Sequence, residues 1–200
     1  MSESASRRDR ILAAASSLIA QKGLQALRMS EVATTADVTP HLLAYHFPSK
    51  QALLTAALEH AARRAPSTNL LHRTPGVAAR ETLRTALLAE FDERSSVREL
   101  NLVWNEVAAL PNAQDALHAQ LRAVTEDWND QVMIGVLRCI AEGSMRSDLA
   151  PESLAAMLTA MVEGLSQRWL AGVLDVAEAR EALDHLLTAF QAPAPAYPCP

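Results

Sequence analysis

Apolar residues recur every three or four positions along most of the chain, the spacing that places them on one face of an α-helix. The first such stretch covers residues 7–22, with Ile11, Ala15, Leu18 and Ile19 on one face. Nowhere does the strict alternation typical of a β-strand stand out. The pattern therefore predicts an all-α protein of about nine helices, over roughly 7–22, 29–36, 40–47, 50–64, 76–93, 97–109, 112–142, 151–171 and 176–190.

Short polar residues, prolines and glycines mark the ends of these helices. Gly23 ends the first helix, and Gly143 begins a loop that runs to Ala150. The expected N-terminal signals are Pro40, Ser49, Thr74 followed by Pro75, Ser96 with Glu99 at capping-box spacing, Pro111 with Asn112, Pro151 and Asp175. These boundaries predict an N-terminal domain over 1–48, a connecting helix over 49–65, a second helical domain over 66–191 and a disordered proline-rich tail over 192–200.

Composition limits the classes of protein that remain. Half of the 200 residues are hydrophobic, enough for a packed core. No apolar run approaches the length that spans a bilayer, and the N-terminus is charged, so we expect a cytoplasmic protein without a membrane partner. Cys139 lies in a helical pattern and Cys199 in the tail, which indicates two unpaired thiols and no metal site.

Charge is spread unevenly along the chain. Residues 1–65 carry eight Lys and Arg against five Asp and Glu, whereas residues 66–200 carry ten against eighteen. The N-terminal part is therefore net positive within a protein whose net charge is −5. This pattern favours local contact of the N-terminal part with a polyanion.

Residues 37–50, Asp-Val-Thr-Pro-His-Leu-Leu-Ala-Tyr-His-Phe-Pro-Ser-Lys, indicate a helix-turn-helix. Leu43 and Phe47 are four residues apart and share the buried face of the third helix, while His41 and Tyr45 point the opposite way. Outward residues of this kind suit thymine methyls, base edges and phosphates. Lys50 and the first amides of the next helix form an anion site suited to a backbone phosphate.

These residues, in register, resemble the TetR/AcrR family of bacterial transcriptional regulators. The resemblance rests on Ala20–Gly23, Ser30–Ala33, Ala36–Thr39, Leu43–Lys50 and Leu53–Leu54. It implies a homodimer whose two third helices enter successive major grooves of a near-palindromic operator, roughly 34–36 Å apart. The matching DNA-contacting positions are Arg28, Ser30, Thr39, Pro40, His41, Leu42, Ala44, Tyr45 and Lys50.

Four positions depart from the usual pattern of the family. Asp37 stands where glycine is common in the turn, and its side chain tolerates turn geometry. Arg28 stands where a capping threonine is common, so either Ser30 caps the second helix or Arg28 binds a phosphate. Leu42 and Ala44 replace frequent threonine and tyrosine, which removes two phosphate contacts. The alternatives are a helix-turn-helix that binds no DNA, and His41 and Tyr45 as ordinary surface residues.

The C-terminal two-thirds carries no nucleophile elbow, phosphate loop, dinucleotide fingerprint or metal-spaced His and Cys cluster. An enzyme therefore has almost no support, and no cofactor is expected. The carboxylates of Glu126 and Asp130, four residues apart, are more consistent with a solvated face than with a cation site. The stretches Asn101–Leu110, Gly143–Glu152 and Met161–Leu165 resemble the C-terminal domain of BetI-like regulators.

That resemblance implies a ligand cavity among the central helices and a dimer formed by the last two helices. The candidate ligand residues are Phe91, Asn101, Trp104, Asn105, Glu106, Met133, Leu137, Met157 and Met161, although aromatic and methionine residues at such positions are also typical of plain core. Trp104 with Glu106 favours a cation, so the unknown effector is expected to be apolar or cationic. The candidate dimer residues are Leu158, Leu165, Trp169, Leu183 and Leu187.

The sequence thus predicts a ligand-responsive, DNA-binding transcriptional regulator. The favoured form is a repressor that binds its double-stranded operator as a homodimer and is released by a small molecule. An activator or dual regulator is the first alternative. A helical small-molecule-binding protein without specific DNA binding is the second.

Overall fold

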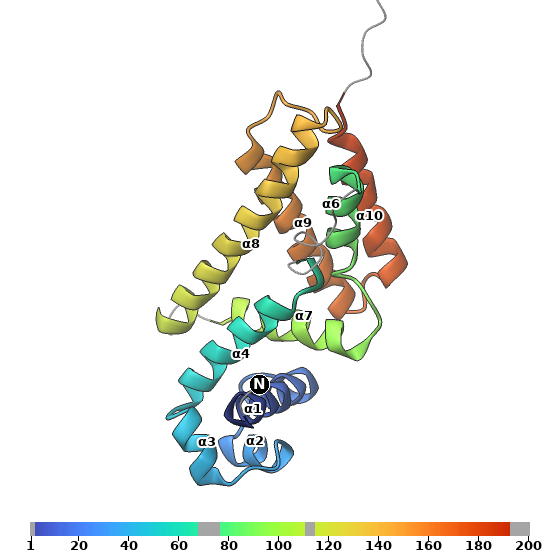
Figure 1. Cartoon of the computed structure of the whole chain (residues 1–200). Helices are drawn as coiled ribbons and strands as arrows, with labels where there is room; N and C mark the ends of the chain where they lie inside the picture. The colour runs from blue at the N-terminus through green and yellow to red at the C-terminus, as the bar shows by residue number, and fades with distance from the viewer. Residues whose placement is uncertain (1–2, 68–76, 111–114, 193–200) are drawn as a thin grey trace, which may run out of the picture. The chain divides into compact units, whose positions relative to one another are not determined.

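The computed structural model describes residues 3–67, 77–110 and 115–192. These residues form helices with only one isolated β-bridge, between Met145 and Gln191. The all-α prediction is confirmed (Figure 1). The helices are α1 Glu3–Lys22, α2 Met29–Thr35, α3 Pro40–His46, α4 Lys50–Arg64, α6 Ala79–Leu88, α7 Ser95–Ala108, α8 Asp115–Ala141, α9 Pro151–Leu170 and α10 Val176–Ala189.

The chain divides into two compact units. Unit 1 comprises Met1–Ala65 and Asp92–Glu126, and unit 2 comprises Pro66–Phe91 and Asp127–Pro200. This division differs from the predicted domains because it groups residues 92–126, which hold α7 and the first part of α8, with the N-terminal helices. Helix α8 therefore contributes residues to both units.

Unit 1 is organised around α1, which packs against α2, α4 and α7. Helix α2 in turn packs against α3, so that the two short helices share the core of the larger ones. The apolar face predicted for α1 is buried, with Ile11 and Ala15 fully inaccessible. Other large contributors to this core are Leu12, Ile19, Leu24, Val32, Leu43, Phe47, Leu53, Leu58, Val103, Val107 and Leu117.

Unit 2 is built from α6, α9 and α10, with residues of α8 completing its core. Phe91 and Trp169 meet edge to face at its centre, with ring centroids 6.2 Å apart. Polar contacts fix the helices around this core. Arg84 of α6 donates two hydrogen bonds to Asp184 of α10, and the Glu142 carboxylate accepts the backbone N–H of Ala79 at 2.8 Å.

Most of the predicted helix ends agree with the structure, and one cap does not. Helix α4 has the expected bounds, and Ser49 and Asp175 cap α4 and α10 through their side chains. The capping box predicted for Ser96 and Glu99 is wrong, because α7 already begins at Ser95 and its N-cap residue, Arg94, makes no side-chain cap. Helix α6 is shorter than expected. Thr74, Pro75, Pro111, Asn112 and tail residues 193–200 lie outside the described residues.

The five residues predicted for the dimer interface fill the core of unit 2. Each is at most 6% exposed, so the protomer's own core already encloses all five side chains. A side chain enclosed by its own protomer has no surface left for a second copy. The residues concerned are Leu158, Leu165, Trp169, Leu183 and Leu187.

Among the described residues, none of the helices is both long and apolar enough to cross a membrane.

Candidate nucleic-acid interface

The candidate recognition helix is α3, which is held to unit 1 by one face. Thr39 caps it by accepting the Leu42 N–H at 3.2 Å, and Pro40 occupies its first turn, where no N–H is needed. Leu43 and Phe47 are almost fully buried, as the spacing predicted. The turn from α2 passes through Asp37, whose φ of 52° lies in the left-handed region. The geometry is that of a helix-turn-helix.

The opposite face of α3 is open to solvent. Tyr45 is 78% exposed, the highest exposed fraction among the large hydrophobic side chains described in unit 1. His41 and Ala44 are exposed, while Leu42 is half-buried. The Tyr45 ring meets the His46 ring edge to face with centroids 5.4 Å apart, which supports Tyr45 in its outward position. This face offers a phenol, an imidazole and small apolar groups to a groove.

Two contacts from α1 hold the helix-turn-helix in place. The Arg8 guanidinium lies over the Phe47 ring, 5.4 Å from its centroid, so one cation is fixed beside the end of α3. Lys22 forms an ion pair with Glu31 of α2, and this hydrogen bond lowers the pKa of the Glu31 carboxyl. Sequence analysis did not single out Arg8 or Lys22. The one signal for Arg8 was its place among the arginines that lie off the apolar face of α1.

The start of α4 supplies a second group of hydrogen-bond donors. Ser49 caps the helix by accepting the Ala52 N–H at 3.1 Å, which leaves the first amides of α4 directed outward in the usual way. Lys50 donates to the backbone carbonyl of Gln25 at 3.2 Å. An ammonium group has three donors, so this bond positions Lys50 and still leaves it able to contact a phosphate.

At the start of α2, the structure decides between two expectations. Arg28 occupies the N-cap position, is exposed and makes no side-chain cap. Ser30 lies inside the helix, where its carbonyl accepts the Thr34 hydroxyl, so the prediction that Ser30 caps α2 is wrong. Arg28 is thus an exposed cation at a helix N-terminus, a position compatible with a phosphate contact.

The predicted ligand residues are divided between the two units. Asn101, Trp104, Asn105 and Glu106 lie on α7 in unit 1, whereas the remaining five lie in unit 2. The Glu106 carboxylate accepts the Leu24 N–H at 2.8 Å and so ties α7 to the loop after α1. In unit 2, Phe91 is core, Met133 and Met161 are partly buried against the core, and Leu137 and Met157 are exposed.

Metal-ligating side chains do not gather in the part of the chain that the structure describes. No group of three His, Cys, Asp or Glu side chains there could hold a metal ion. Burial raises the pKa of the Cys139 thiol to about 11, so this cysteine is a packed, unreactive thiol at neutral pH.

The fold and this interface define a helix-turn-helix DNA-binding regulator. Residues 11–57 match the bacterial regulatory proteins of the tetR family, and residues 79–192 match the C-terminal domain of BetI-type transcriptional repressors. The protein belongs to the TetR family of transcriptional regulators.

Individual relatives agree with this assignment. The chain is 32% identical to the HTH-type transcriptional repressor KstR of Rhodococcus jostii, over 76% of this chain and 73% of that protein. It is 23% identical to the regulator TtgR of Pseudomonas putida, over 84% and 82% of the two chains. A crystal structure of a TetR-family regulator from Rhodococcus sp. is 38% identical, with a TM-score of 0.78 over 92% of this chain and 95% of that one.

A further solved structure shows the same fold at lower identity. It is a transcriptional regulator from Saccharomonospora viridis in complex with choline, 24% identical, with a TM-score of 0.82 over 95% of this chain and all of that one.

Proposed function

We propose that this TetR-family regulator is a ligand-released repressor that binds a near-palindromic operator as a homodimer in the bacterial cytoplasm. The observation that carries the proposal is the two-sided character of α3, buried through Leu43 and Phe47 and open to solvent through His41 and Tyr45. A recognition helix needs this division, because one face must fix its orientation while the other contacts base edges.

Groups that can bind phosphate lie at the starts of α2, α3 and α4. Thr39, whose oxygen already caps α3, retains a hydroxyl hydrogen to donate, and Lys50 and Arg28 flank the helix from α4 and α2. We assign Arg28, Ser30, Thr39 and Lys50 to the sugar-phosphate backbone. We assign Pro40, His41, Leu42, Ala44 and Tyr45 to the groove, where Leu42 and Ala44 suit thymine methyl groups.

The partner surface of the homodimer is assigned to the exposed side of α9, since its buried side is already used. Ala156, Met157 and Ala160 lie on this side, and Met157 is 47% exposed. Small residues next to an exposed methionine allow a helix of a second copy to approach closely, and apolar surface at a helix face favours association.

The effector is proposed to be a small apolar or cationic molecule. The choline bound by the regulator from Saccharomonospora viridis is consistent with a cation, and this chain matches the BetI-type C-terminal domain. Choline is therefore the first probe. Absence of heat on titrating the full chain with choline would count against a quaternary ammonium effector and leave the apolar class.

Binding to the DNA that flanks the protein's own gene tests the proposal. Tyr45→Ala should weaken specific binding by about 1–3 kcal/mol and relax the base preference under α3, whereas Lys50→Ala should weaken binding to every sequence and reduce the salt slope by about 1. Arg122→Ala is the matched control, because Arg122 is an exposed cation of α8 outside the interface. A footprint that survives both substitutions unchanged would refute the interface.

A further inference from the structure

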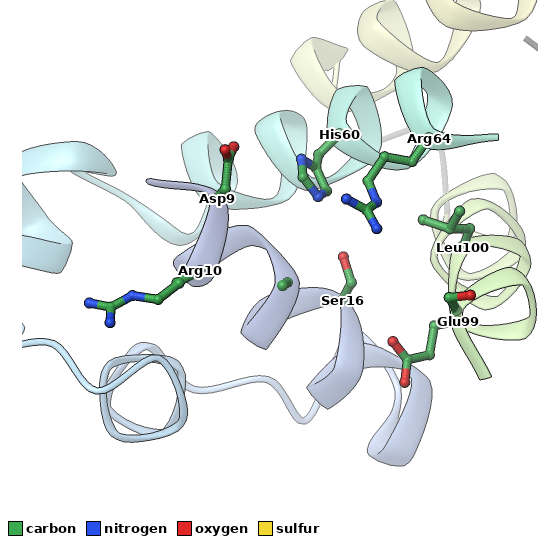
Figure 2. A pocket seen from close by; sticks show the side chains of 9 residues that line it. Asp9, Arg10, Ser16, His60, Arg64, Glu99 and Leu100 are labelled. Carbon is green, nitrogen blue, oxygen red and sulfur yellow. The ribbon is translucent and has the colours of Figure 1, made fainter. Parts of the chain in front are cut away.

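A half-open cavity lies within unit 1, where α1, α4 and α7 pack against one another. Its volume is about 350 Å³, at the lower end of the roughly 300–1,000 Å³ typical of small-molecule sites. None of the residues assigned above to DNA or to the effector lines it. Figure 2 shows side chains that line it from all three helices: Asp9, Arg10 and Ser16 from α1, His60 and Arg64 from α4, and Glu99 and Leu100 from α7.

Ser16 is the clearest sign that this cavity takes a polar ligand. Its side chain is only 4% exposed, and its Oγ has no hydrogen-bond partner among the described residues. Figure 2 shows this oxygen directed into the space below His60 and Arg64. Buried hydroxyl groups in proteins are almost always hydrogen-bonded, so an unpaired one at a cavity wall indicates a group that an occupant satisfies.

The charged groups of the cavity define the occupant further. Arg64 and Glu99 have no ion-pair partner within the described ranges, and the Arg64 guanidinium extends toward Ser16 in Figure 2. A guanidinium group binds a carboxylate through two parallel hydrogen bonds, and a carboxylate such as Glu99 accepts from an ammonium group. Asp9 and Arg10 of α1 line the same cavity, so it carries charges of both signs. Arg64 on α4 and Glu99 on α7, an unpaired cation and an unpaired anion, complement a molecule that carries both charges.

Part of the cavity wall is apolar. Leu100 of α7 and Ala13 of α1 line the same cavity. A short aliphatic chain would be removed from water there, while the two charged ends of the molecule meet Arg64 and Glu99.

We propose that the cavity between α1, α4 and α7 is a binding site for a small zwitterion of the amino-acid class, with its carboxylate on Arg64 and Ser16, its ammonium group on Glu99 and its aliphatic part against Leu100. Such a ligand contacts three helices of unit 1 at once. Helix α4 continues through Ser49 and Pro48 directly into the recognition helix. The site therefore lies next to the DNA-binding elements, and none of the predicted ligand residues lines it.

His60 provides a reporter for this site. Burial, and then the Arg64 charge, lower the pKa of the His60 imidazole, with Arg63 and Arg8 acting in the same direction and Asp9 opposing them. Glu99 also faces the cavity from α7. A bound carboxylate adds negative charge beside the imidazole, so occupancy raises the pKa of His60.

The experiment uses L-leucine as the probe, with the full chain followed by calorimetry and by NMR of the histidine rings, the His60 signals being assigned with His60→Gln. L-leucine should bind and raise the pKa of His60. Leucinamide, which lacks the carboxylate, and 4-methylpentanoate, which lacks the ammonium group, should bind at least tenfold more weakly.

Variants then test the individual contacts. Arg64→Gln should weaken L-leucine binding about tenfold or more, the loss expected for one charged hydrogen-bonding partner. Arg63→Gln is the matched control, because Arg63 is the neighbouring cation and pairs with Glu59 instead. Glu99→Gln should weaken binding of L-leucine and leave that of 4-methylpentanoate unchanged. Ser16→Ala should weaken both.

Three results would overturn the proposal. The first is no heat and no movement of the His60 signals up to roughly 10 mM L-leucine, the range of weak affinities. The second is equal affinity of the wild-type protein for the three probes, a result that does not depend on whether any variant folds. The third is equal binding by the Arg63→Gln and Arg64→Gln proteins.

Discussion

Asp37 forms the turn before the recognition helix in a conformation that favours glycine. Its φ of 52° is the one positive value among the described non-glycine residues. Asp37→Gly should raise the free energy of unfolding by up to about 1 kcal/mol, because glycine enters this region without a Cβ clash. Asp37→Val should lower it by about 1–2 kcal/mol, since a β-branched residue is strained there. Urea unfolding measures both. Equal destabilisation by the two substitutions would show that the turn is not strained.

Glu90 is a buried carboxyl whose titration opposes folding as the pH rises. It accepts the Ser67 N–H at 2.8 Å, but burial outweighs this bond and raises the pKa of Glu90 above its ordinary value. Between the ordinary pKa and the raised one, the folded state holds a proton that the unfolded state has lost. The free energy of unfolding therefore decreases as the pH rises through this window.

Glu90→Gln removes this dependence, because the amide stays neutral. The difference in unfolding free energy between the variant and the wild type should grow in favour of the variant from about pH 4.5 upward and then level off above the raised pKa. Subtracting the two proteins cancels carboxyls whose pKa is lowered, such as that of Asp184 beside Arg84. A difference that stays flat from acid to neutral pH would contradict a raised pKa.

At the level of the helices, local signals predicted the ends that short-range chemistry controls. Ser49 and Asp175 each accept an amide of the following turn, so the residue type alone was sufficient. Ser96 and Glu99 have the same spacing, yet α7 begins earlier and Glu99 lines the cavity of unit 1 instead. A capping box competes with tertiary packing, and sequence spacing does not show which of the two prevails.

Asp175 makes the most complete cap in the described part of the chain. Its carboxylate accepts the Glu178 N–H, and the Glu178 side chain accepts the Asp175 N–H, both at 2.8 Å. Asp175→Ala should lower the free energy of unfolding by about 1 kcal/mol, because one of the first amides of α10 loses its partner. Asp175→Asn, which keeps an acceptor oxygen, is the control and should remain within about 0.5 kcal/mol of the wild type. Thermal unfolding of both proteins decides this.

At the level of the whole molecule, the sequence predicted the recognition helix better than the ligand and dimer residues. The buried face of α3, with Leu43 and Phe47, and its exposed face, with His41 and Tyr45, both follow from the helical period of one short segment. Leu158 and Leu165 have an equally regular spacing, but their face is enclosed by the protomer's own core. An apolar helix face predicts burial without showing what covers it, and only the packing of distant segments distinguishes a core from an interface.

A charge introduced on the exposed side of α9 tests the proposed dimer surface directly. Ala160→Glu places a charge beside Ala156 and Met157. Dimerisation through this side would bury the charge without a partner, so the dimer should dissociate. Because Ala160 is exposed in the protomer, helicity and unfolding temperature of the monomer should change little. Two recognition helices roughly 34–36 Å apart require the dimer, so operator affinity should fall at least about tenfold.

Ala123→Glu is the matched control, because it adds the same charge at an exposed alanine of α8. Analytical ultracentrifugation of both variants and operator binding at one fixed salt concentration separate the outcomes. A monomeric Ala160→Glu protein that has lost operator binding, beside a dimeric Ala123→Glu protein that binds normally, supports the assigned face. If Ala160→Glu instead remains dimeric with full operator affinity, the two copies associate through another surface, and the exposed side of α9 is left to solvent.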